Sequence, residues 1–171
     1  MPDGERAASA GGARETLSWE RFGIATRELA VEIAADGYRP DIVLAVARGG
    51  LAVAGALAYA LAVKNCFAMN VEFYTGVDER LPVPVVLPPT LDLVDIRGMR
   101  VLIADDVADT GKTLELVRKE IVEHVAEARC AVLYRKPRSV IDPEYVWAHT
   151  ERWIEFPWSS APPVVSGTRD S

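Results

Sequence analysis

Residues 101–113, with the sequence VLIADDVADTGKT, limit the possible folds of this chain more than any other segment. An apolar run ends in two adjacent carboxylates, Asp105 and Asp106, and a third, Asp109, opens the sequence Asp-Thr-Gly-Lys-Thr. After this segment, apolar residues recur at helical spacing, at Leu114, Val117, Ile121 and Val125. The order predicts a buried strand over 101–105, a tight turn and a helix over 111–127, which is typical of an α/β protein.

The predicted turn has the chemistry of a phosphate site. Open α/β sheets bind ligands at the carboxyl ends of their strands. A glycine-containing turn that leads into a helix offers backbone N–H groups and the positive end of the helix dipole. Because carboxylates repel a phosphate, we expect Asp105 and Asp106 to face sugar hydroxyls or a divalent cation instead.

The spacing excludes two other nucleotide motifs. A Walker A loop that ends in Gly111-Lys112-Thr113 requires a glycine at position 106, which is Asp106 here. A dinucleotide fingerprint requires GxGxxG directly after the strand, where this chain has two carboxylates. Helix capping alone needs one polar side chain, so three carboxylates with Thr-Gly-x-Thr indicate a further role.

The other segments predict one parallel sheet with right-handed crossovers, flanked by helices. Arg48, Gly49 and Gly50 follow a strand, so we expect them at the same sheet edge as Asp105 and Asp106. Glycines let backbone approach an anion closely, and an arginine can bind it with two hydrogen bonds. The expected elements are a helix capped by Ser18 and ended by Gly37, a strand over 41–47, a helix over 51–63, a strand over 66–74, a loop or proline-bounded edge hairpin over 75–97 and a strand over 129–135.

The composition indicates a single soluble domain. The chain has 171 residues and a net charge of −6, which argues against a general nucleic-acid surface. Residues 51–63 are too few to span a bilayer, and residues 1–16 lack the apolar core of a signal peptide. The two cysteines, Cys66 and Cys130, lie in apolar stretches and are expected to be buried free thiols. We therefore expect a cytoplasmic protein without membrane or nucleic-acid partners.

The 101–113 segment resembles the ribose-phosphate signature of type I phosphoribosyltransferases, which use 5-phosphoribosyl 1-pyrophosphate (PRPP) as donor. Later sequences, Lys136-Pro137 and Trp-Ile-Glu-Phe-Pro-Trp over 153–158, resemble the xanthine-guanine members. The resemblance implies an α/β domain over 17–160 with a mobile flap over 75–97 and a C-terminal hood from about 136 to 160. It leaves a disordered tail over 1–16 and a flexible tail over 161–171.

The resemblance also implies a role for each site residue. Asp109 would act as the general base at purine N7, and Asp106 would bind Mg²⁺. Lys136 would donate to the purine 6-oxo group, Trp153 would stack on the ring, and the backbone of Ile154 and Glu155 would accept from the 2-position. The PRPP site would comprise Arg48, Gly49, Gly50, Arg80, Asp105, Asp106, Asp109, Thr110, Gly111, Lys112 and Thr113.

The implied function is Mg²⁺-dependent transfer of the phosphoribosyl group to guanine, xanthine or hypoxanthine in purine salvage, by a homodimer or homotetramer. Two alternatives stay open from the sequence. One is a non-catalytic regulator that senses PRPP or a nucleotide through the same fold. The other is a phosphoribosyltransferase for another acceptor, such as a pyrimidine.

Overall fold

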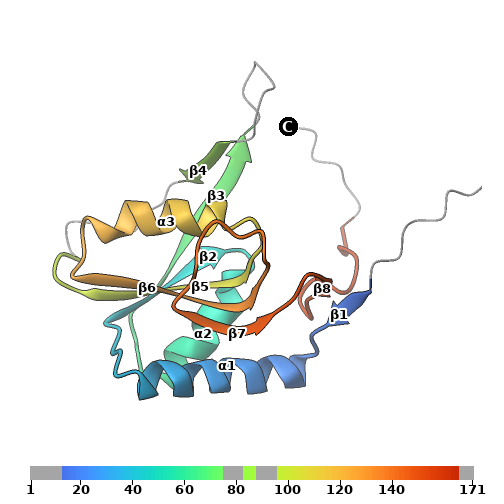
Figure 1. The fold of residues 1–171 in the computed structure, drawn as a ribbon, viewed down its shortest axis with the longest axis horizontal. Coiled ribbons are helices and arrows are strands. Elements are labelled where there is room, and N and C mark those ends of the chain that lie inside the picture. Colours follow the sequence, from blue (N-terminus) through green and yellow to red (C-terminus); the bar gives the residue numbers. More distant parts are fainter. Residues whose placement is uncertain (1–12, 75–82, 88–95, 166–171) are drawn as a thin grey trace, which may run out of the picture.

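The computed structural model describes residues 13–74, 83–87 and 96–165, which form a six-stranded sheet and a separate two-stranded sheet (Figure 1). In the main sheet the strand order is β4–β3–β2–β5–β6–β7, and every neighbouring pair is parallel except β3 and β4. The strands are β2 (Ile42–Ala47), β3 (Cys66–Tyr74), β4 (Val83–Leu87), β5 (Arg100–Ala108), β6 (Glu127–Arg135) and β7 (Tyr145–His149). The predicted parallel α/β sheet is thus confirmed.

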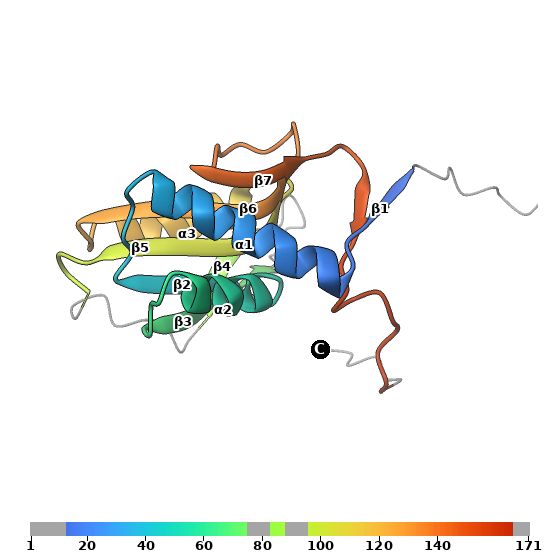
Figure 2. The same cartoon turned by 90° about the horizontal axis from the view of Figure 1, so that it is seen from below.

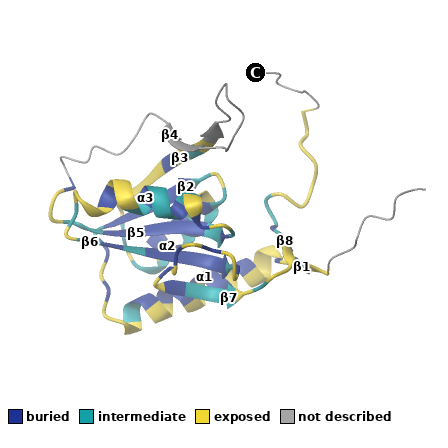
Figure 3. Cartoon of the chain, turned by 45° about the horizontal axis from the view of Figure 1, so that its top comes forward, coloured by how far each residue is buried: buried dark blue, intermediate teal, exposed yellow. Residues whose placement is uncertain are grey.

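Helices cover both faces of this sheet (Figures 1 and 2). Helices α1 (Trp19–Ala35) and α2 (Gly50–Ala60) lie on one face, and α3 (Lys112–Val122) lies on the other. Within β2, Val43 and Ala45 pack toward α1 and α2, whereas the alternate residues pack toward α3. Because both faces are covered, β2 is apolar at every position, and its first five residues are buried (Figure 3).

Several elements differ in length from the prediction, including α2, which ends at Ala60 instead of 63, and β6, which begins at Glu127 instead of 129. Strand β5 continues to Ala108, because its pairing with β6 extends to the pair Ala108 and Arg135. Asp105, predicted as the last residue of the strand, and Asp106, predicted to follow it, therefore both lie within the strand. Helix α3 ends at Val122 instead of 127, and the chain then turns so that the Ala126 N–H donates to the Met99 carbonyl at 2.9 Å.

The N-terminal segment contains a strand that the sequence did not indicate. Residues Arg14–Thr16, expected in the disordered tail, form β1 and pair in parallel with β8 (Trp153–Glu155) at one end of the main sheet. The Leu17 N–H extends this pairing to the Glu155 carbonyl at 3.0 Å. A three-residue strand has too few residues for an alternating pattern, so periodicity could not reveal it.

Aromatic side chains hold the C-terminal segment against α1. Phe156 and Trp158 stack with their ring centroids 4.9 Å apart, and Phe22 of α1 meets Trp158 edge-to-face at 5.5 Å. The described part of the 75–97 segment forms β4 at the sheet edge, in agreement with the edge-hairpin alternative. No helix among the described residues is long and apolar enough to cross a membrane.

Candidate functional site

The loop after β2 lies directly against the carboxylates of β5. Gly49 caps α2 and Gly50 begins it, and the preceding peptide bond, Ala47–Arg48, is cis. A Cβ on Gly49 would overlap the Asp106 carboxylate, and a Cβ on Gly50 would overlap the backbone of β5. The close approach therefore requires glycine at both positions, and it brings the predicted anion-binding loop to the predicted carboxylates.

Asp105 and Asp106 are adjacent carboxylates in a largely buried environment. Burial raises the pKa of Asp105 well above its ordinary value, and the charge of Asp106 adds to the rise. Burial also raises the pKa of Asp106. Asp105 Oδ1 accepts a hydrogen bond from the Asp106 N–H at 2.8 Å, but neither carboxylate has an ion-pair partner among the described residues. Ligand hydroxyls or a cation would offset this cost of burial.

The donor set fits a divalent cation that takes most of its ligands from a substrate. The carboxylate of Asp106 lies beside Gly49, where an anionic ligand bound to the loop would also lie. No group of three or more His, Cys, Asp or Glu side chains suited to a metal occurs in the described residues. Mg²⁺ prefers a few oxygens and keeps several waters, so one carboxylate together with substrate oxygens would satisfy it.

The turn after β5 opens onto a cleft at the N-terminus of α3. Gly111 adopts a left-handed conformation with φ of 74° and precedes Lys112, the first residue of α3. The first N–H groups of a helix have no partner within it, so they are available to an anion. The cleft has a volume of about 290 Å³ and is lined by Val46, Ala47, Val71, Asp105, Val107, Asp109, Thr110, Gly111, Thr113 and Leu114.

A second hollow adjoins this cleft at Lys136. It has a volume of about 280 Å³ and is lined by Lys136, Pro137, Arg138 and Glu151. Lys136 is only 8% exposed, and its Nζ lies 3.6 Å from Asp109 Oδ1 and 5.6 Å from the centre of the Trp153 ring. Asp109 lines the cleft at α3, and its carboxylate contacts Lys136 and Arg138, which line the hollow, so it links the two parts of the candidate site.

Sequence and structure comparisons agree on the origin of this arrangement. The phosphoribosyl transferase domain family matches residues 13–163. The chain belongs to the phosphoribosyltransferase family. The xanthine-guanine phosphoribosyltransferase of Ruegeria sp. (strain TM1040) is 33% identical over 156 residues, which cover 85% of each protein. The crystal structure of a purine phosphoribosyltransferase from Pyrococcus horikoshii is 35% identical, with a TM-score of 0.76, and the match covers 90% of this chain and 99% of that one.

The short strand β8 carries the other three residues that were predicted for the base site, Trp153, Ile154 and Glu155. Trp153 is 66% exposed and presents its ring to Lys136, whereas the Ile154 side chain is buried in the core. The Glu155 carbonyl already accepts the Leu17 N–H, and its carboxylate accepts from the Thr16 hydroxyl at 3.3 Å. Of these three residues, only Trp153 has a side chain in contact with the hollow's lysine.

Two cations predicted for the pyrophosphate are less well defined. Arg48 is exposed and has no ion-pair partner among the described residues. Arg80 lies outside the described residues, as does most of the expected flap. The structure adds a cation that was not among the predicted site residues. Arg138 pairs with Asp109, and a charged residue three positions beyond the end of β6 was the only available signal.

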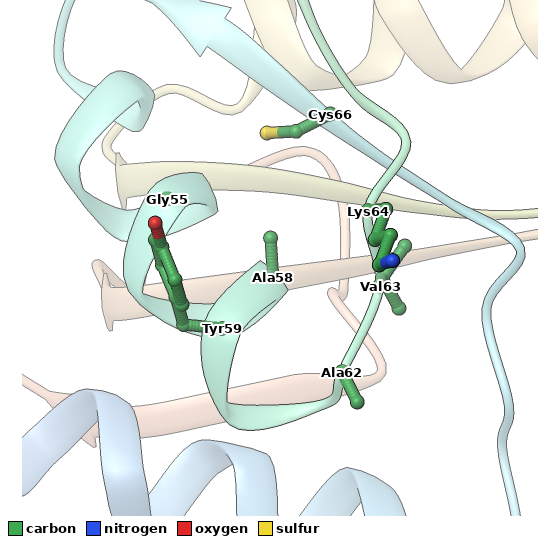
Figure 4. Close-up of a pocket in the computed structure, with 7 residues that line it drawn as sticks. All are labelled: Gly55, Ala58, Tyr59, Ala62, Val63, Lys64 and Cys66. Atoms are coloured by element: carbon green, nitrogen blue, oxygen red, sulfur yellow. The ribbon is translucent and has the colours of Figure 1, made fainter.

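A further hollow of this phosphoribosyltransferase lies away from the candidate site, beside α2 (Figure 4). Its lining is mostly apolar, so it does not offer the hydrogen-bonding groups that PRPP needs. Cys66 was expected to be buried but is exposed here, because α2 ends at Ala60 and leaves the start of β3 uncovered. The residues that line this hollow are Gly55, Ala58, Tyr59, Ala62, Val63, Lys64 and Cys66.

The expected dimer or tetramer stays a prediction.

Proposed function

We propose that the protein transfers the 5-phosphoribosyl group from PRPP to a 6-oxopurine in purine salvage. The products are pyrophosphate and the nucleoside 5′-monophosphate. The observation that carries the proposal is the position of Asp109 between the cleft at α3 and the buried ammonium of Lys136, 3.6 Å away. The names of the relatives, xanthine-guanine and purine phosphoribosyltransferase, support the same acceptor class.

In this proposal the sheet edge binds PRPP in three parts. The N–H groups and hydroxyls of residues 110–113 hold the 5′-phosphate, and Asp105 and Asp106 accept from the ribose hydroxyls. The amides of Gly49 and Gly50 hold the pyrophosphate, with Arg48 and Arg80 as its cations. Each part matches a chemical group of PRPP to the protein group that binds it best.

The main barrier is cleavage of the C1–O bond to pyrophosphate, so charge stabilisation matters most. Mg²⁺, held by Asp106 and by substrate oxygens, would supply positive charge to the leaving pyrophosphate. The Gly49 and Gly50 amides and Arg48 would add donors at the same oxygens. The two backbone amides are held in place by the loop, so they would lower the barrier without having to reorganise as charge develops.

The base would bind in the hollow beside Lys136. An ammonium donates to a 6-oxo group but not to a 6-amino group, so Lys136 selects guanine, xanthine or hypoxanthine over adenine. The exposed face of Trp153 suits a flat heterocycle. The backbone of Ile154 and Glu155 would accept from the 2-position, and the Glu155 carbonyl keeps a second acceptor site beside its bond to Leu17. Asp109 would accept the N7 proton.

A nucleotide-formation assay with PRPP and individual bases, with and without Mg²⁺, tests the proposal. We expect turnover of one or more 6-oxopurines that is lost without Mg²⁺. An Asp109→Asn variant should lose about 100-fold or more in kcat while it still binds PRPP. Turnover of only uracil or adenine would instead indicate another acceptor, and PRPP binding without any turnover would indicate a regulator.

A further inference from the structure

The Asp109 carboxylate is held by an exposed arginine as well as by Lys136. Arg138 Nε donates to Asp109 Oδ1 at 2.7 Å, and Nη2 donates to Oδ2 at 2.7 Å. The Arg138 side chain is 63% exposed, whereas that of Lys136 is 10% exposed. Asp109, the proposed general base, therefore lies between the buried Lys136 and the exposed Arg138. The proposed function gives Lys136 a role but gives none to Arg138.

The backbone sets Arg138 and Asp109 opposite each other. The Lys136 N–H donates to the Ala108 carbonyl at 3.0 Å, and the Val140 N–H donates to the Thr110 carbonyl at 2.9 Å. These two hydrogen bonds join the two turns on either side of the ion pair. The register of the two turns therefore fixes the backbone position of Arg138 opposite Asp109, so the ion pair forms between two ordered segments.

The pairing leaves Asp109 able to accept a further proton donor. A carboxylate has about four acceptor sites. Both the Arg138 Nη2 at 2.6 Å and the Nε lie near Oδ1, and Lys136 Nζ is also nearest to Oδ1. Oδ2 takes only one of the arginine contacts, so it is the oxygen with free acceptor capacity.

We propose that Arg138 is a positioning residue, which fixes the plane of the Asp109 carboxylate so that Oδ2 faces the N7–H of the bound base. The inference rests on the proposed function. The terminal torsion of an aspartate is broad and has no strong rotamer preference of its own. A two-point contact with a planar guanidinium removes that freedom, which a lysine cannot do with a single ammonium.

The test is chemical rescue of an Arg138→Ala variant, since the exposed side chain leaves a space that opens to solvent. We expect kcat to fall about 10- to 100-fold, as for a misplaced catalytic group, with the KM for PRPP within about twofold and an unchanged melting temperature. Added guanidinium, far below denaturing concentration, should restore part of kcat. Arg138→Lys should recover less than the full rate, because it keeps the charge and loses the two-point contact.

Arg100→Ala is the matched control. Arg100 forms a similar two-point contact with Asp41 at the opposite end of the sheet, with Nε and Nη2 each 3.2 Å from a carboxylate oxygen. Its loss should leave kcat unchanged, and guanidinium should not raise the rate of this variant or of Asp109→Asn. An Arg138→Ala enzyme with wild-type kcat, or with a loss that guanidinium does not rescue, would overturn the positioning role alone. A wild-type protein that turns over no base would overturn the proposed function, and this inference with it.

Discussion

Asp36 and Asp41, at the amino end of the main sheet, have lowered pKa values, whereas Asp105 and Asp106, at the carboxyl end, have raised ones. At the amino end, hydrogen bonds from Tyr145 and Arg129 lower the pKa of Asp36, and those from Arg100 lower the pKa of Asp41. At the carboxyl end, burial raises the pKa values of Asp105 and Asp106, which have no ion-pair partner among the described residues. Asp36 and Asp41 are therefore paired within the protein, whereas a bound ligand would have to supply partners for Asp105 and Asp106.

Asp41 and Asp105 differ in their partners as well as in their burial. Asp109 does not follow this contrast, because it lies at the carboxyl end and pairs with Lys136 and Arg138. Asp41 accepts both side-chain and backbone hydrogen bonds from Arg100, the latter at 2.8 Å, and it donates its own N–H to the Arg100 carbonyl. Within the described residues, Asp105 accepts a backbone hydrogen bond from the N–H of its neighbour Asp106 and has no cationic partner. Burial without a partner destabilises an ionised carboxylate, so a hydrogen-bond donor or a cation that binds to it gains binding free energy.

The largest expected effect comes from the glycine that brings the β2 loop to the carboxyl end. In Gly49→Ala, the new Cβ would displace the Asp106 carboxylate, so we expect about a 100-fold loss of kcat/KM. Steady-state kinetics with PRPP and a 6-oxopurine would measure it. Gly55→Ala is the control, because a Cβ there meets nothing within 4 Å. Equal activity in the two variants would contradict the functional contact between loop and carboxylate.

A smaller effect is expected at the N-terminus of α3. Gly111 has φ of 74°, and a Cβ on it would overlap the Ser139 side chain. We expect Gly111→Ala to raise the KM for PRPP about tenfold, equivalent to about 1.4 kcal/mol. Gly98→Ala has the same left-handed backbone, with φ of 82°, but open space around it. Both variants should lose stability in thermal unfolding, and a raised KM in Gly98→Ala as well would mean that strain alone explains the result.

Asp105→Asn should stabilise the free protein while it weakens PRPP binding. The folded state binds the Asp105 proton more tightly than the unfolded state, so the stability of the wild type falls as pH rises above the ordinary carboxyl range. The melting temperature of the variant should exceed that of the wild type by a few degrees at pH 8, since about 1 kcal/mol corresponds to about 2–4 °C in a chain of this size. The difference should shrink toward acidic pH, and a variant less stable at pH 8 would contradict the raised pKa.

Asp41→Asn should give the smallest effect and the opposite sign. The lowered pKa of Asp41 means that its ion pair stabilises the fold above the ordinary carboxyl pKa and is lost as pH falls through the lowered value. We expect a melting temperature about 1–2 °C lower at neutral pH, no difference in strong acid, and unchanged kcat. Differential scanning calorimetry across pH would measure this, and a deficit that persists in acid would argue against the ion pair as its cause.

The sequence predicted the elements whose patterns are long and regular. The strands β2 and β5 were predicted from their apolar runs, and α1 was predicted from its helical spacing. The carboxylates in the 101–113 segment indicated which edge of the sheet carries the candidate site. The predicted end of β5 was wrong, because the strand stops where its pairing with β6 stops, and this tertiary contact leaves no local pattern in the sequence. The three-residue strands β1 and β8 pair only with each other within the described residues, so neither could be predicted from its own sequence.

The candidate site was predicted as a set of residue types, and the structure supplies their neighbours. The sequence indicated that Asp109 and Lys136 belong to one site, but not that their charged groups lie 3.6 Å apart. Arg138 was missed because its role comes from two backbone hydrogen bonds between separate turns. No local pattern reports such a register. Arg80 lies outside the described residues, so its role stays a prediction.

The pairing of β1 with β8 bears on the order in which the protein is made. The strand that carries Trp153 forms its ladder with residues 14–16, which leave the ribosome long before it does. The strands of the central sheet can pair in turn during synthesis, whereas β1 can pair only after residues 153–155 have been made. A nascent chain could therefore form the sheet edge with Asp105 and Asp106 before it forms the strand with Trp153. Removing residues 14–16 would act on that strand, which lies far away in the sequence.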